Sequence, residues 1–99
     1  MHRYKRVTCK DGFSMSVQAN ANVYCIPRMN YAPKYLEVEI GFISEKEELL
    51  MAYCDEPGQP MDTVYGYVPV GVVALVIAKH GGMVDGEVPP GVAELRAPK

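Results

Sequence analysis

PVGVVALVIAKHGG, residues 69–82, is the stretch that decides the fold, and Lys79 and His80 are its only strongly polar side chains. A proline at its start and two glycines at its end are typical boundaries of an α-helix, so we predict a helix over residues 70–80. Its many β-branched residues leave a buried strand over residues 70–78 as the alternative. A surface helix normally has a polar face, whereas apolar residues surround this one. Because a 99-residue chain has a small interior, we expect a second copy of the chain to cover this helix in a homo-oligomer.

The composition is that of one globular domain. Hydrophobic residues make up 48% of the chain, enough for one core, and no apolar run reaches the roughly 18 residues of a membrane span. The N-terminal MHRYKRVTCK lacks the apolar stretch of a signal peptide. The three cysteines form no CxxC pair, and the chain has two histidines, so neither a disulfide framework nor a zinc site is expected. We therefore expect a cytoplasmic protein with reduced thiols, no metal and no cofactor.

Residues 3–10 and 13–19 are predicted to form a β-hairpin. A two-residue Asp-Gly turn would place Val7 opposite a serine and would mix apolar and polar side chains on both faces. A three-residue loop with Gly12 in the left-handed conformation places Val7 opposite Met15 and gives one consistent apolar face. We therefore predict the bulged, three-residue hairpin.

The remaining elements follow from alternation and turn signals. Three further strands are expected, over residues 23–26, 35–43 and 63–68. Ser44 precedes Glu47 by the three residues of a capping box, which predicts a helix from there to about residue 54. Together the elements predict an α+β domain over residues 1–88, with two helices on one face of an antiparallel sheet of about five strands. The proline- and glycine-containing tail, residues 89–99, is expected to lie extended on a neighbour or to be disordered.

The charges are unevenly distributed along the chain, whose net charge is −2. Residues 1–35 contain six basic residues and one acid, and residues 36–99 contain four basic residues and eleven acids. Such asymmetry indicates either a basic patch that meets an anion or two charged faces that meet within the fold or between subunits. Six basic residues are few for a nucleic-acid footprint, so we do not expect nucleic acid as a partner.

Several motifs resemble those of a known group of proteins. They are DGFSMSVQA at 11–19, YCIPR at 24–28, EVEIGF at 37–42, TVYGYVPV at 63–70 and KHGG at 79–82. The pattern resembles small uncharacterised proteins of tailed bacteriophages and prophages, over residues 7 to about 90. The resemblance carries no catalytic signature. It implies a phage-encoded protein in the cytosol of the infected bacterium, of a size typical of proteins that counter host defences by binding a defence complex or sequestering a nucleotide signal.

No set of residues predicts catalysis. The chain contains no GxxxxGK, HExxH or GxSxG motif. His80 follows Lys79 at the end of the predicted helix, where a cation complements the helix dipole. Cys25 lies in VYCIP and is interpreted as a buried structural thiol, and Cys54 follows an acidic helix that would raise its pKa. We therefore expect that the protein is not an enzyme.

A proline-bounded loop, residues 27–34, carries the side chains of a nucleotide pocket. Arginine can clamp a phosphate, asparagine can read a base edge and tyrosine can stack on a ring. The candidate ligand-binding residues are Tyr24, Arg28, Asn30, Tyr31, Lys34 and Tyr35. Tyr65 and Tyr67 are expected on one side of their strand, where they extend a stacking face or pack under the first helix. The alternative is that the loop is a plain surface connection.

These residues predict a non-enzymatic protein that holds a small anionic, nucleotide-like ligand at junctions between its own copies. The alternative function is a protein–protein interaction module that docks on a host defence or replication complex through an acidic face. That face would comprise Glu37, Glu39, Glu45, Glu47 and Glu48.

Overall fold

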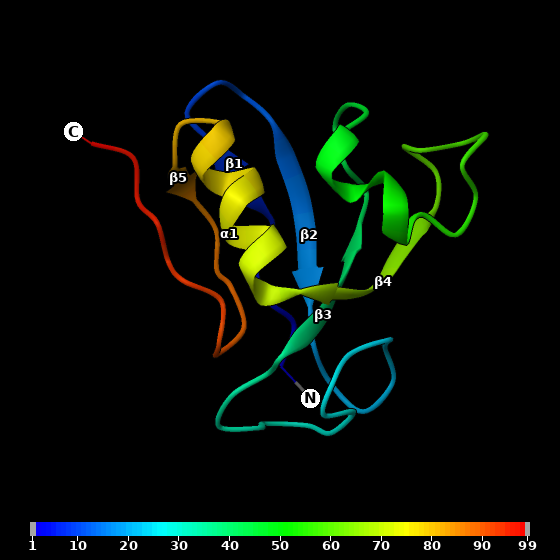
Figure 1. The fold of residues 1–99 in the computed structure, drawn as a ribbon. Helices are drawn as coiled ribbons and strands as arrows, with labels where there is room; N and C mark the ends of the chain where they lie inside the picture. The colour runs from blue at the N-terminus through cyan, green and yellow to red at the C-terminus, as the bar shows by residue number, and fades with distance from the viewer. Residues whose placement is uncertain (1, 99) are drawn as a thin grey trace.

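The computed structural model describes residues 2–98 and contains one five-stranded antiparallel sheet with the strand order β4-β3-β2-β1-β5 (Figure 1). The strands are β1 (Val7–Cys9), β2 (Ser14–Gln18), β3 (Glu37–Gly41), β4 (Val64–Pro69) and β5 (Met83–Asp85). Two helices accompany them, the 3-10 helix η1 (Glu48–Tyr53) and the α-helix α1 (Val70–Lys79). The predicted α+β class, with two helices and a five-stranded antiparallel sheet, is confirmed. No helix within residues 2–98 is long and apolar enough to cross a membrane.

The β1–β2 hairpin has the predicted register. Val7 pairs with Met15, and the neighbouring threonine and serine pair on the opposite face. The Cys9 backbone N–H donates to the Phe13 carbonyl at 2.8 Å, and Gly12 has φ +95°. A three-residue loop with a left-handed glycine therefore closes the hairpin, because only this length keeps the apolar side chains on the core face.

Residues 70–79 form an α-helix, so the helix prediction is confirmed and the strand alternative is wrong. Two backbone hydrogen bonds close its C-terminal end, from Gly82 N to the Ile77 carbonyl at 2.9 Å and from Gly81 N to the Ala78 carbonyl at 3.1 Å. Both glycines have positive φ. This pattern is a Schellman motif, which satisfies the last carbonyls and reverses the chain.

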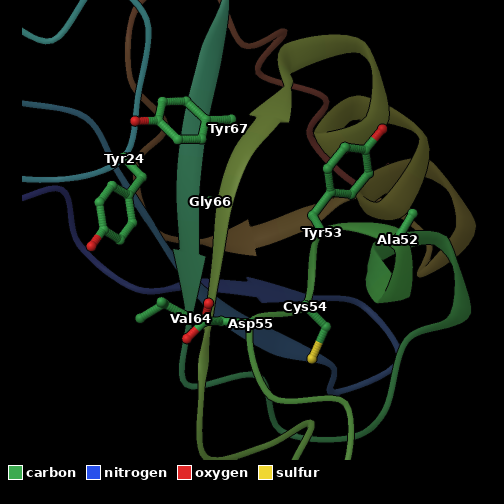
Figure 2. A pocket seen from close by; sticks show the side chains of 8 residues that line it. All are labelled: Tyr24, Ala52, Tyr53, Cys54, Asp55, Val64, Gly66 and Tyr67. Carbon is green, nitrogen blue, oxygen red and sulfur yellow. The ribbon is translucent and has the colours of Figure 1, made fainter.

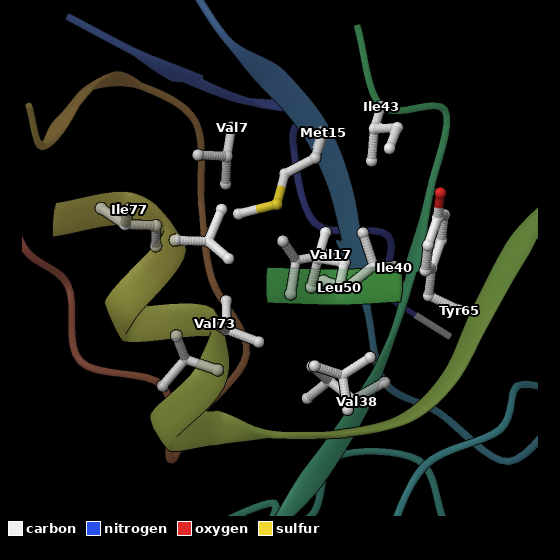
Figure 3. Packing of buried hydrophobic residues seen from close by; sticks show 14 of the residues in the cluster. Val7, Met15, Val17, Val38, Ile40, Ile43, Leu50, Tyr65, Val73 and Ile77 are labelled. Atoms are coloured by element: carbon white, nitrogen blue, oxygen red, sulfur yellow. The ribbon is translucent and has the colours of Figure 1, made fainter. Parts of the chain in front are cut away.

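The core lies between the sheet and the two helices (Figure 3). Helix α1 contributes Val73, Val76 and Ile77, and η1 contributes Leu50. The sheet contributes the apolar side chains of one face, among them Met15, Val17, Val38 and Ile40. Much of the apolar surface of α1 is thus covered by the chain itself, and Leu75 is its exposed large residue.

The fifth strand is not the expected one. Residues 23–26 form no strand, and Ile26 alone makes an isolated bridge, to Glu37. The backbone N–H groups of this segment have mixed acceptors, since Tyr24 N donates to the Glu39 carboxylate at 2.9 Å and Cys25 N donates to the Val23 carbonyl at 3.0 Å. The fifth strand is instead β5, which pairs with β1 because the Schellman turn sends the chain back beside it.

The predicted capping box does not form. Ser44 pairs with Ser14 instead, through a backbone bond and a bond from Ser14 N to the Ser44 hydroxyl, both 2.9 Å. Glu47 is itself the N-cap of η1, where its carboxylate accepts from Leu49 N at 2.8 Å. The expected helix over residues 45–54 is therefore a six-residue 3-10 helix, because the side chain of Glu47 points into the protein rather than back along the chain.

The C-terminal segment lies on its own chain rather than apart from it. Met83 N donates to the Leu95 carbonyl, and Ala97 N donates to the Met83 carbonyl. Pro90 accepts from Tyr35 N at 2.8 Å, and Val92 is buried. The segment that the sequence marks as a tail thus covers the outer edge of β5 as far as residue 98.

Two glycines with positive φ test the hairpin and the tail separately. A Cβ at Gly12 would meet open space, whereas a Cβ at Gly91 would lie 2.2 Å from the Tyr35 carbonyl oxygen. Gly12→Ala is therefore expected to destabilise the fold by about 1–2 kcal/mol through backbone conformation alone. Gly91→Ala is expected to destabilise it more, because the tail must also move away. Urea unfolding measures both, and a smaller effect at Gly91 would contradict the packing of the tail.

Homo-oligomer formation through α1 remains a prediction. Leu75 is 59% exposed and lies on the outer side of the helix. Leu75→Glu would place a charge in such an interface and is expected to release monomers, measured by sedimentation. Met61→Glu, at a comparably exposed residue in the loop between η1 and β4, is the matched control and should leave the assembly unchanged. Sedimentation of the unmutated chain as a stable monomer at micromolar concentration would contradict the prediction.

Candidate functional site

A cleft of about 390 Å³ opens over β4, an edge strand of the sheet (Figure 2). Three parts of the chain contribute to it: the loop before β3, the end of η1 with the residues after it, and β4 itself. The lining residues are Tyr24, Ala52, Tyr53, Cys54, Asp55, Val64, Gly66 and Tyr67. Three tyrosines thus border one glycine-floored depression.

The first wall of the cleft is a pair of tyrosines. The rings of Tyr24 and Tyr67 lie 5.7 Å apart between centroids, tilted by 39°, and Tyr67 N donates to the Tyr24 carbonyl at 3.0 Å. Tyr67 has φ +53° and lies where the β3–β4 register shifts, between Val38 and Ile40. A Cβ at Gly66 would lie 3.1 Å from that of Tyr24. Glycine at this position therefore lets the Tyr24 side chain pack directly against β4.

The second wall is the end of η1. Tyr53 is its last residue and lies across β4 from the other two tyrosines (Figure 2). The next residues are held to β4, since Cys54 bridges Tyr65 and Asp55 N donates to the Val64 carbonyl at 3.1 Å. Tyr53 is therefore held from both sides, by η1 before it and by the contacts of Cys54 and Asp55 with β4 after it.

A cation lies beside the aromatic wall. The guanidinium carbon of the exposed Arg28 is 5.5 Å from the centroid of the Tyr24 ring, within cation–π range. The carboxylate of Glu39 accepts the Tyr24 backbone N–H at 2.9 Å and so fixes the loop on the other side. Chemically, the cleft offers tyrosine rings as its walls, and the planar guanidinium of Arg28 lies beside one of them.

The structure brings only part of the predicted site together. Tyr24 lines the cleft, and Arg28 lies over its ring. Asn30 accepts from a backbone N–H of its own loop, that of Ala21, at 3.0 Å. Tyr35 is fully buried, where it donates to the Met29 carbonyl and accepts from Ala32 N. Tyr31 and Lys34 are exposed and do not line the cleft.

Sequence reasoning missed Tyr53 and misplaced Tyr67. The expectation that Tyr65 and Tyr67 share one side of β4 is wrong, because the bulge buries Tyr65 completely and leaves Tyr67 43% exposed. The glycine between them, Gly66, is the signal that points to such a bulge. For Tyr53 no local signal exists, since its place depends on the packing of η1.

A second cluster surrounds His80, in which His80 and Glu47 are buried and their partners Asp11 and Lys79 are half exposed. Its Nδ1 contacts the Asp11 carboxylate at 2.5 Å, and its Nε2 contacts that of Glu47 at 2.7 Å. The ring of Phe13 stacks on the imidazole at 4.1 Å, with 13° between the planes. Lys79 donates to the second oxygen of Glu47 at 2.9 Å. We call Asp11, Glu47, Lys79 and His80 the His80 network.

The electrostatics of the His80 network favour its ionised form. Burial opposes charge on the imidazole, but its hydrogen bonds with Asp11 and Glu47 outweigh this and raise the pKa of His80. Burial likewise opposes charge on Glu47, yet its hydrogen bond with Lys79 and others keep its pKa below the ordinary value. In its protonated form the imidazole donates from both nitrogens, one to each carboxylate. Glu47, only 2% exposed, thus lies in the interior and not on the acidic face expected from the sequence.

Comparisons with known proteins add no family. A scan against protein-family models and searches of curated proteins and of solved structures each found no match. Within the described part of the chain, no group of histidine, cysteine, aspartate and glutamate side chains is arranged to hold a metal ion. The function is therefore argued from the tyrosine cleft and the His80 network.

The His80 network predicts a pH dependence of stability. The pKa of His80 is raised on folding from 6.5, so its contribution is fully present below that value and is lost as the pH rises through the folded-state pKa. His80→Gln is expected to reduce the free energy of unfolding by about 1.5–3 kcal/mol at acidic-to-neutral pH and to flatten its decline as the pH rises above neutral. Urea unfolding across this range measures both effects. Parallel curves for the two proteins would show that the imidazole carries no stabilising charge.

Proposed function

We propose that this protein is a non-enzymatic binding protein whose tyrosine cleft takes a small anionic, nucleotide-like ligand. The observation that carries the proposal is the meeting of Tyr24, Tyr53 and Tyr67, from three separate segments, around Gly66, with Arg28 beside the Tyr24 ring. A volume of about 390 Å³ lies within the range of pockets for small molecules.

The proposed ligand places its base on the tyrosine wall and its phosphate at the rim. Stacking of a base on an aromatic side chain contributes about 1–3 kcal/mol and accepts any base. The Arg28 guanidinium, 5.5 Å from the Tyr24 ring centroid, is a planar fork that suits two phosphate oxygens at once. Gly66 lets the Tyr24 side chain lie close against β4, which fixes this wall for stacking.

The groups in the cleft favour binding over turnover. Its titratable side chains are three tyrosines, Cys54 and Asp55, and no histidine or lysine lines it. Both ring nitrogens of His80 are held by carboxylates, so neither is available as a base. A ligand is therefore expected to be held and released intact.

The resemblance to tailed-phage proteins supplies the setting of the proposal, which is sequestration of a host nucleotide signal in the bacterial cytoplasm. The alternative, docking on a host complex through the acidic face, has less support. Glu47 is buried against His80, and Glu39 accepts from the Tyr24 backbone, so two of the five acids in that face have internal partners.

Calorimetry with a panel of linear and cyclic nucleotides tests the proposal. Tyr24→Ala and Arg28→Ala are each expected to weaken binding by about tenfold. The first removes a stacking contact of about 1–3 kcal/mol, and the second removes a hydrogen bond to a charged group of about 1.5–3 kcal/mol. Arg28→Lys retains the charge and loses the planar fork, so its affinity should lie between those of the unmutated protein and Arg28→Ala. Tyr31→Ala removes an equally aromatic but distant and exposed side chain, and it should bind like the unmutated protein.

Denaturing the purified protein adds a second readout. A nucleotide carried through purification should be released intact and be detected by absorbance and mass spectrometry. No heat with any nucleotide would exclude the tyrosine cleft as a nucleotide site and would leave docking on a host protein as the better account.

A further inference from the structure

One wall of the cleft rests on a helix with few anchors of its own. The 3-10 helix η1 has six residues, and Leu50 is its one buried side chain. Short 3-10 helices have poor hydrogen-bond geometry and depend on their surroundings. At its start, Glu47 accepts from Leu49 N with its carboxylate and from Leu50 N with its carbonyl, at 2.8 and 3.0 Å. At its end stands Tyr53, the wall of the cleft.

Glu47 is in turn held by His80, which connects η1 to two well-anchored elements. His80 is the C-cap of α1, and its other nitrogen contacts Asp11 in the β1–β2 loop. In Figure 1 the C-terminal end of α1, the β1–β2 loop and the chain leading into η1 all lie at the same end of the molecule. One imidazole thus joins three segments that are distant in the sequence.

This connection requires a proton. A neutral imidazole has one N–H, so beside two ionised carboxylates one of its nitrogens would face an acceptor with a lone pair. The charged groups that face the ring are Asp11 and Lys10 from the hairpin, Glu47 from the start of η1 and Lys79 from α1. Lys79 binds Glu47 but does not replace the contact between η1 and the hairpin.

We propose that protonated His80 is a pH-sensitive lock on the cleft, in which Glu47 and His80 are positioning residues for the Tyr53 wall. Loss of the imidazole proton leaves one N–H for two carboxylates, and in this lock the contact with Glu47 is the one that weakens. Lys79 then holds Glu47 without the imidazole, the start of η1 loosens and Tyr53 moves, so the affinity of the cleft falls as the pH rises. The part that concerns affinity rests on the proposed nucleotide function, and the part that concerns Tyr53 does not.

Nuclear magnetic resonance of the full chain tests the lock without a ligand. The ring signals of His80 and Tyr53 are followed from about pH 6 to 9, below the range in which free tyrosines titrate. Both rings are expected to change with one midpoint. In His80→Gln, which is neutral throughout, the Tyr53 signals should not move with pH. Lys10→Gln, on the same rim but without a contact to Glu47, should retain the shared midpoint. Constant Tyr53 signals while His80 titrates in the unmutated protein would overturn the lock.

The same titration with a ligand tests the link to binding. A 3′,5′-cyclic nucleotide is used, because its phosphodiester does not titrate in this range. Its affinity for the cleft should fall by up to ~10-fold as the pH rises through the midpoint of the His80 titration. This is the scale of one charge-assisted hydrogen bond. Binding that is independent of pH would overturn the lock and leave the proposed function intact. A shared His80–Tyr53 midpoint without any nucleotide binding would support the lock and contradict the proposed function.

Discussion

Two carboxylates that share one imidazolium hold three separate parts of this chain together. Asp11 belongs to the hairpin loop, Glu47 begins η1 and His80 ends α1. Burying such charges is costly unless every hydrogen-bonding position is used. Here the Asp11 carboxylate also accepts from Phe13 N, and the second oxygen of Glu47 accepts from Leu49 N and Lys79. No buried side-chain polar atom within residues 2–98 lacks a partner, so the network specifies how these segments meet.

The tyrosine cleft results from the way the sheet ends. A bare edge strand exposes unpaired backbone groups and is normally covered. On β4 the cover comes in two pieces, from the Tyr24 segment at one end and from the residues after η1 at the other. Between them Gly66 has no side chain, so the Tyr24 side chain packs against β4 there, and the cleft lies between this wall and Tyr53. The ligand site that we propose is therefore the gap between two pieces of cover, and each piece supplies an aromatic wall.

The two features are linked through η1. Its first turn belongs to the His80 network and its last residue to the cleft, only six positions after Glu47. Loops and short helices are where binding residues commonly lie, positioned by a more rigid framework. In this protein the framework is the sheet and α1. The His80 side chain fixes the start of η1 relative to this framework through its contact with Glu47.

Local sequence determined the elements whose deciding residues are neighbours in the chain. The Val7–Met15 register follows from the length of one loop, and α1 ends where Gly81 and Gly82 adopt positive φ. The class of fold follows from these elements and the alternation in β3. Tyr24 and Arg28 were also found from sequence, because Arg28 lies in the proline-bounded loop and Tyr24 flanks it.

Only the tertiary structure decided the features that join distant segments. His80 meets Glu47 across 33 positions and Asp11 across 69, so a spacing that favours a capping box gave way to a buried ion pair. In the same way β5 became the fifth strand, and a bulge separated Tyr65 from Tyr67. The physical reason is that each outcome depends on which partner satisfies a charge or a backbone group, and those partners become neighbours only when the chain folds.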